Sequence, residues 1–105
     1  MQRLLAGRPV NPVGLGCMNV SWAYGAPPPE DEAIRLLNQA LDLGYDHFDT
    51  ANIYGGGKNE ALIRRAVGHR RQEFFLASKV GIVVDGPRRG VDCSPEAIAI
   101  SLDAS

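Results

Sequence analysis

The sequence has few of the features that mark membrane, secreted or nucleic-acid-binding proteins. No apolar run approaches the ~20 residues that a membrane-spanning helix requires, and the first residues, MQRLLAGRPV, lack an apolar stretch of signal-peptide length. The two cysteines, Cys17 and Cys93, are far apart in a chain without a secretion signal, so we expect free thiols. With a formal net charge of -1, the chain lacks the excess of positive charge that binding to nucleic acid or to an anionic membrane favours. We therefore expect a cytoplasmic protein with neither kind of partner.

Short apolar strands and amphipathic helices alternate along the 105 residues, 45% of which are apolar. Each predicted strand is followed by a loop and then a helix, and the strand ends near Val20, Ala51 and Lys79 are about 30 residues apart, as in βα units of a parallel sheet. The strands are expected at 13–20, 45–51 and 73–83, and the helices at 30–43, 60–67 and from 94 onward.

Local signals mark the ends of these helices. Gly44 follows the first helix, where a left-handed cap is favoured, and Asn59 is suited to cap the start of the second. Ser94 followed by Pro95 is a strong start signal for the third helix. The stretch DGPRRGVDC at 85–93 is expected to be a loop.

Three βα units cannot close a barrel, which takes eight strands and about 250 residues. An open three-stranded parallel sheet would leave long edges unpaired. The sequence therefore predicts an α/β fold that forms the first part of a larger domain, with no internal linker or second domain.

Three polar residues are predicted to meet at one edge of the sheet. Asp49 lies at the carboxyl end of the second strand, Tyr54 in the loop that leaves it, and Lys79 at the carboxyl end of the third strand. Ligands and chemistry collect at this edge in parallel α/β folds. Each residue alone has an ordinary structural explanation, but together they favour an active site. An ammonium beside a phenol favours the phenolate, and a carboxylate holds the ammonium charged, a set suited to proton transfer at a carbonyl oxygen.

The segments FDTANIYGGGKNEALIRRAV, FFLASKVG and VGLGCMNVSWAYG together resemble the N-terminal part of an aldo-keto reductase. The resemblance runs from about Val13 to Ser105 and implies a (β/α)8 TIM-barrel fold, here about its first three βα units. Residues 1–105 would then be the N-terminal portion of a single barrel domain. The implied activity is reduction of aldehydes or ketones to alcohols by hydride transfer from NADPH, or from NADH in some members, with a small carbonyl compound as substrate.

The resemblance also implies roles for individual residues. Asp49, Tyr54 and Lys79 would be three of the family's four catalytic residues, with Tyr54 as the general acid. The fourth is a histidine at the end of the fourth strand, a position that neither His47 nor His69 matches. We therefore expect the 105-residue chain alone to be inactive, because that histidine and most of the cofactor pocket lie outside it.

The cofactor and substrate contacts implied by the resemblance lie nearby. Cys17 and Met18, in the loop after the first strand, and Asp49 would contact the cofactor, and Trp22 and Tyr24 would line the substrate pocket.

Two other functional classes stay open. A non-catalytic cofactor-binding or assembly module could derive from the same barrel, and an exposed sheet edge would favour its self-association. A metal-dependent hydrolase using Asp49 has less support, because no H-x-H or carboxylate–histidine cluster is present to hold a metal ion.

Overall fold

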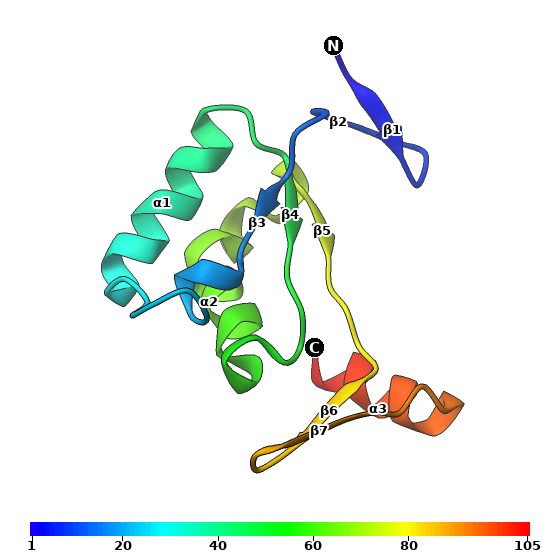
Figure 1. Ribbon diagram of the computed structural model, residues 1–105. Helices are drawn as coiled ribbons and strands as arrows, with labels where there is room; N and C mark the ends of the chain where they lie inside the picture. The colour runs from blue at the N-terminus through cyan, green and yellow to red at the C-terminus, as the bar shows by residue number, and fades with distance from the viewer.

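A three-stranded parallel sheet with the order β3-β4-β5 lies at the centre of the computed structural model, which describes residues 1–105 (Figure 1). The strands are short: β3 is Leu15–Gly16, β4 is His47–Asp49 and β5 is Phe75–Ala77. Gly16 pairs with Asp49, and Asp49 pairs with Ala77, so the three carboxyl ends meet at one edge. The parallel βα arrangement predicted from the spacing is confirmed.

Two helices pack against each other beside this sheet (Figure 1). α1 spans Glu30–Asp42 and α2 spans Lys58–Val67, and each buries one apolar stripe. α1 begins with three acidic residues, which suit the positive end of the helix dipole. After α1, Gly44 adopts the predicted left-handed conformation, with φ of 97°.

The helices and the sheet share one apolar core of twelve buried residues. At its centre, the Phe48 ring of β4 stacks on Phe74, with 5.1 Å between the ring centroids. Leu37 of α1 and Val67 of α2 are also fully buried. The first two βα units therefore form a packed layer that fixes the carboxyl ends of β4 and β5.

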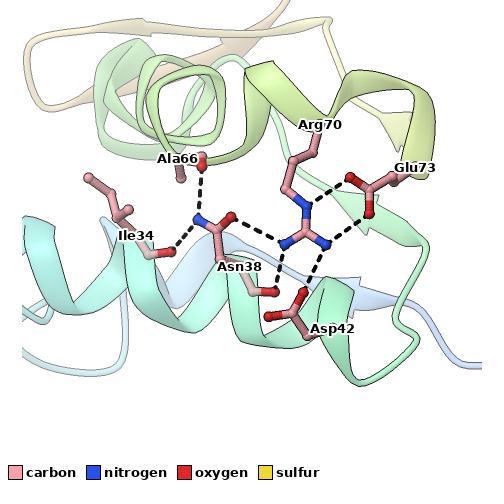
Figure 2. A network of polar contacts seen from close by, with 6 residues as sticks. All are labelled: Ile34, Asn38, Asp42, Ala66, Arg70 and Glu73. Carbon is pink, nitrogen blue, oxygen red and sulfur yellow. Dashed lines mark hydrogen bonds and ion pairs between the residues drawn. The ribbon is translucent and has the colours of Figure 1, made fainter.

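A polar network joins the carboxyl-terminal ends of α1 and α2 (Figure 2). Arg70 donates two hydrogen bonds of 2.8 Å to the carboxylate of Glu73 and forms an ion pair of 2.8 Å with Asp42. Asn38 of α1 accepts a hydrogen bond from Arg70 and donates one to the carbonyl of Ala66 at the end of α2. Hydrogen bonds to Glu73 and Asp42 raise the pKa of the guanidinium, and the hydrogen bond from Arg70 lowers the pKa of Glu73.

The first predicted strand is much shorter than expected. Of residues 13–20, only Leu15 and Gly16 form a strand, and Met18–Val20 form a 3-10 helix. The amide of Cys17 donates to the Asp49 carbonyl at the end of the strand pairing. Beyond it, Val20 and Ser21 donate to carbonyls three residues back, which coils the chain at the sheet edge.

The third predicted strand, at 73–83, also ends early, at Ala77. After Gly81, which has φ of 111°, the chain forms an antiparallel hairpin of β6, Ile82–Asp85, and β7, Arg88–Val91. The prediction of a loop at 85–93 was therefore wrong over β7. Gly86 and Pro87 make a two-residue turn, with Gly86 at positive φ, as a tight hairpin with glycine at its first turn position requires.

A hairpin lies at the N-terminal end of the chain and a helix at the C-terminal end. An N-terminal hairpin, β1 at Arg3–Leu5 with β2 at Arg8–Val10, was not anticipated from the sequence. α3, Pro95–Ala104, begins as predicted with Ser94, whose hydroxyl accepts from the Ala97 amide at 3.3 Å. None of the helices combines the length and the apolar character that crossing a membrane would take.

Candidate active site

The carboxyl ends of β4 and β5 bring Asp49 and Lys79 into contact. Asp49 is the last residue of β4, and Lys79 lies two residues beyond β5. The Nζ of Lys79 is 2.9 and 2.8 Å from the two carboxylate oxygens of Asp49 and 2.7 Å from the Thr50 carbonyl. All three donors of the ammonium therefore have partners, which holds it over the strand ends.

Tyr54 completes the group that the sequence predicted. Its ring centre lies 5.2 Å from Lys79 Nζ, at the distance of a cation–π contact. Partial burial lowers the pKa of Lys79, but the ion pair with Asp49 and the proximity of Tyr54 outweigh it and raise that pKa above its ordinary value. The lysine is therefore charged throughout the neutral range. About half of the Lys79 and Asp49 side-chain surfaces is exposed, so a ligand can reach the pair.

The glycines after Tyr54 turn the chain from the strand end into α2. Gly55, Gly56 and Gly57 have φ values of 61°, 64° and 89°, a region that residues with a β-carbon rarely adopt. A β-carbon at Gly55 would also lie 3.4 Å from the Ser21 carbonyl. The run therefore serves as a tight turn directly beside Tyr54.

Asn59 has a different role from the one predicted. The residue that precedes α2 is Gly57, in the left-handed region, and Asn59 lies inside the helix with its side chain fully buried. Its Nδ2 donates to the Cys17 carbonyl at 2.6 Å and to the Ser21 hydroxyl at 2.7 Å, and its Oδ1 accepts from the Thr50 hydroxyl at 2.5 Å. Asn59 thus ties α2 to the segment that leaves β4 and to the loop that follows β3, beneath the site. The sequence signal for this role is that Asn59 is a polar residue on the apolar stripe of a helix, because buried polar groups in proteins are hydrogen-bonded.

The two predicted substrate-pocket residues differ in position. The half-buried Trp22 ring lies 5.9 Å from the Tyr54 ring, at an interplanar angle of 31°. Tyr24 is 87% exposed and has no place among the residues that line the hollows beside Tyr54. The structure brings Trp22 to the site and leaves Tyr24 outside it.

Cys17 and Met18 also differ. The Cys17 side chain is 1% exposed, and burial raises the pKa of its thiol to about 12, so it is a neutral core residue. Its backbone amide and carbonyl are both used, by Asp49 and Asn59. The expected cofactor contact is therefore not supported for the Cys17 side chain and stays a prediction for the partly exposed Met18.

Two adjoining hollows open at this edge of the sheet. The smaller, of about 90 Å³, is lined by Tyr54 and Lys79. The larger, of about 440 Å³, lies between the Asn52–Gly56 turn and the hairpin and is lined by Trp22 and Arg89. Asn52, Ile53 and Ile82 line both hollows. The hairpin, and with it this wall of the groove, was not predicted from the sequence. A third hollow of about 450 Å³, between α2, β5 and α3, contains none of the predicted catalytic residues.

The arrangement suits proton donation by the Tyr54 phenol at the edge of the sheet. A phenol next to a paired ammonium can release a proton to a developing alkoxide, since the ammonium stabilises the resulting phenolate. No group of three or more histidine, cysteine, aspartate or glutamate side chains is arranged to hold a metal ion.

A family model described as "Aldo/keto reductase family" matches residues 12–105. The chain is 36% identical over 92 residues to the probable aldo-keto reductase 1 of Glycine max, a match that covers 86% of this chain and 27% of that protein. It is 35% identical over 72 residues to the uncharacterized oxidoreductase YqkF of Bacillus subtilis, covering 69% of this chain and 22% of that protein.

Solved structures show the same relationship. The holo form of the aldo-keto reductase AKR11C1 from Bacillus halodurans superposes with a TM-score of 0.84 at 30% identity and covers 98% of this chain. The glycerol dehydrogenase AKR11B4 of Gluconobacter oxydans gives a TM-score of 0.74 at 28% identity over 92% of the chain. The chain spans 34% and 31% of these two structures and about a quarter of the curated relatives. These structures are (β/α)8 barrels, so the central sheet and its helices are part of a barrel.

Proposed function

Because this chain belongs to the aldo/keto reductase family, we propose that it supplies the proton-donating side of an NADPH-dependent carbonyl reductase. The substrate would be an aldehyde or ketone and the product an alcohol. The observation that carries the proposal is the placement of Lys79, whose Nζ is held by both oxygens of Asp49 and lies 5.2 Å from the Tyr54 ring centre.

Each of the three residues has a defined task in this proposal. Tyr54 donates its phenolic proton to the carbonyl oxygen as negative charge develops there. Lys79 stabilises the phenolate that remains, and its raised pKa keeps it charged at neutral pH. Asp49 holds the ammonium in place through its two hydrogen bonds.

The residues beside this group fit the nicotinamide end of NADPH. Met18 presents a partly exposed apolar side chain. It follows Cys17, whose backbone amide donates to the backbone carbonyl of Asp49. The carboxylate of Asp49 keeps lone pairs that can accept from an amide group. When bound, the cofactor would supply the hydride, with NADH as the alternative donor. The chain's own residues would orient the carbonyl and provide the proton.

The test is substitution of Tyr54 in a complete barrel that carries this sequence. We expect Tyr54→Phe to lower kcat for aldehyde reduction by about 10²–10⁴-fold, the usual contribution of a positioned general acid, while cofactor binding is retained. Tyr24→Phe is the matched control, because Tyr24 is 87% exposed and does not line the site. Retention of activity in Tyr54→Phe would overturn the role of Tyr54.

We also expect the isolated 105-residue chain to reduce no carbonyl substrate, because the resemblance assigns a further histidine and most of the cofactor pocket to later strands. Mixing the chain with NADPH and an aromatic aldehyde while following cofactor absorbance tests this. Turnover comparable to that of a complete reductase would contradict it. No observation specifically favours the alternative of a non-catalytic binding or assembly module.

A further inference from the structure

Arg89 is the one charged side chain that lines the larger hollow beside the proposed active site. The groove of about 440 Å³ is otherwise formed by aromatic, aliphatic, glycine and amide groups. Its volume lies within the range of small-molecule sites, which combine an apolar lining with a few polar groups. A lone cation in such a lining selects ligands by charge.

The hairpin register fixes which side chains face this groove. Successive residues of a strand point to opposite faces, and directly paired residues of two strands share a face. Val84 pairs with Arg89, so Val84, Ile82 and Arg89 lie on one face, and all three line the groove. Arg88 pairs with Asp85 on the opposite face and does not line it. Two adjacent arginines are thus separated into one that faces the groove and one that faces away.

Contact with Trp22 holds Arg89 in place. The guanidinium carbon lies 5.3 Å from the Trp22 ring centre, and Trp22 in turn lies 5.9 Å from the Tyr54 ring. Figure 1 shows the hairpin extending beyond the carboxyl end of β5, so this contact links it to the first loop. Stacking on an aromatic face leaves the donors at the edge of a guanidinium free to bind a planar anion.

The charge of Arg89 is uncompensated within the chain. The chain's salt bridges are made by Arg35, Arg65, Arg70 and Lys79, and Arg89 makes none. In particular, the charge of Lys79 is offset by Asp49 at 2.8 Å, whereas Arg89 has no such partner. A guanidinium can bind a planar carboxylate through two parallel hydrogen bonds, and the apolar lining of the groove suits a ligand that carries its anion on an apolar body.

We propose that Arg89 makes the groove a subsite for the carboxylate of an oxo-acid, that is, a substrate carrying both a carbonyl and a carboxylate. This inference rests on the proposed function for the carbonyl end of the ligand. The two hollows share Asn52, Ile53 and Ile82 in their linings, so Arg89 lines the hollow next to the one that Tyr54 and Lys79 line. Arg89 selects the substrate and takes no part in the transfer of hydride or proton.

Binding to the 105-residue chain tests the subsite without turnover. Trp22 is the only tryptophan, so its emission reports on the groove alone. The probes are levulinate, a keto acid, and its neutral methyl ester, titrated at low and at high salt. We expect Arg89→Gln to weaken levulinate binding about tenfold or more, the size of a charged hydrogen bond, and methyl levulinate to bind weakly and equally to all variants.

Matched variants separate a specific subsite from surface charge. Arg88→Gln removes the same charge from the opposite face and should change levulinate binding less than about twofold, because Arg88 does not line the groove and solvent screens its charge from a ligand there. Arg89→Lys should give intermediate binding, since it keeps the charge and loses the planar fork. Calorimetric titration repeats each measurement without relying on Trp22. Equal levulinate binding by Arg89→Gln and the unchanged chain, or an equal loss in Arg88→Gln, would overturn the subsite.

Kinetics in a complete barrel that carries this sequence distinguish the two proposals. If both hold, Arg89→Gln raises KM for levulinate and leaves KM for methyl levulinate unchanged. If levulinate binds through Arg89 but neither of the two probes nor an aromatic aldehyde is reduced, the proposed function fails while the anion subsite stands. If both probes are reduced with the same KM in Arg89→Gln and the unchanged protein, the subsite fails and the proposed function stands.

Discussion

The segments before and after Ala77 differ sharply in how they are stabilised. Residues 15–77 contain the sheet and all twelve residues of the apolar core cluster. Residues 78–105 form the hairpin and α3, and their large apolar side chains, among them Val84, Val91 and Ile100, are exposed. The candidate site lies at the boundary: Asp49 and Tyr54 come from the packed segment, and Lys79 comes from the start of the exposed one. Lys79 is held by its ion pair with Asp49 and by its place two residues beyond β5.

The sharpest expected contrast is between a core and an exposed apolar side chain. Phe48→Ala should lower the free energy of unfolding by about 3–5 kcal/mol, because Phe48 is fully buried against Phe74 and the cavity cannot collapse. Ile100→Ala, at a side chain 70% exposed, should change it by less than about 0.5 kcal/mol. Urea denaturation followed by circular dichroism measures both. Similar losses in the two variants would show that α3 is packed as firmly as the core.

The two cysteines lie one in each segment, so their reactivity toward an alkylating reagent compares the two segments. Cys17 is buried with a thiol pKa of about 12, and Cys93 is exposed. Alkylation at neutral pH should modify Cys93 at least about 100-fold faster, because Cys17 reacts only when its region opens, at a cost of about 2.7 kcal/mol or more. Mass spectrometry of the labelled chain gives the two rates. Equal rates would mean that the core around Cys17 is open, whereas full denaturant should equalise them.

Substitution of Asn59 tests how much its buried hydrogen bonds beneath the site contribute to stability. Asn59→Ala removes three hydrogen bonds and leaves the buried Thr50 hydroxyl and Cys17 carbonyl without that partner, so we expect a loss of about 2–3 kcal/mol. Asn19→Ala, at an exposed position, is the matched control and should be nearly neutral. The measurement is the urea midpoint. An equally small effect at Asn59 would mean that the network adds nothing to stability.

The smallest expected effect is the acid dependence of the helix-end network. Because Arg70 lowers the folded-state pKa of Glu73 below its unfolded value, this contact stabilises the fold above the unfolded pKa and is lost as pH falls through the folded pKa. Glu73→Gln should therefore be slightly less stable than the unchanged chain at pH near 7, with the difference disappearing in acid. Thermal melts across this range check it. A difference that persists in acid would exclude the charge as its cause.

The pattern of the sequence identified much of this molecule in advance. The alternation of apolar strands and amphipathic helices predicted the parallel sheet and both packed helices, because local periodicity fixes which faces are buried. The joint spacing of Asp49, Tyr54 and Lys79 predicted their convergence, since parallel strands place their carboxyl ends at one edge. The resemblance to the aldo-keto reductases, carried by the segments around these residues, is confirmed by the family model.

Other features depended on contacts between distant segments. β7 was mistaken for part of a loop because the Gly86–Pro87 turn dominates the local composition, while the strand pairing of Val84 with Arg89 is set by register. Asn59 was mistaken for a cap because its three partners lie between nine and 42 residues away in the chain.

The alternation of the three central strands with three helices, the sheet edge at which the candidate catalytic residues meet and the family can all be inferred from the amino-acid sequence alone. The burial of Cys17, the exposure of Tyr24 and the contact of Arg89 with Trp22, while Arg88 faces away, emerge only in the folded chain. The physical reason is that periodicity encodes burial along one element. Which side chains meet across elements depends on backbone turns and register that no single segment specifies.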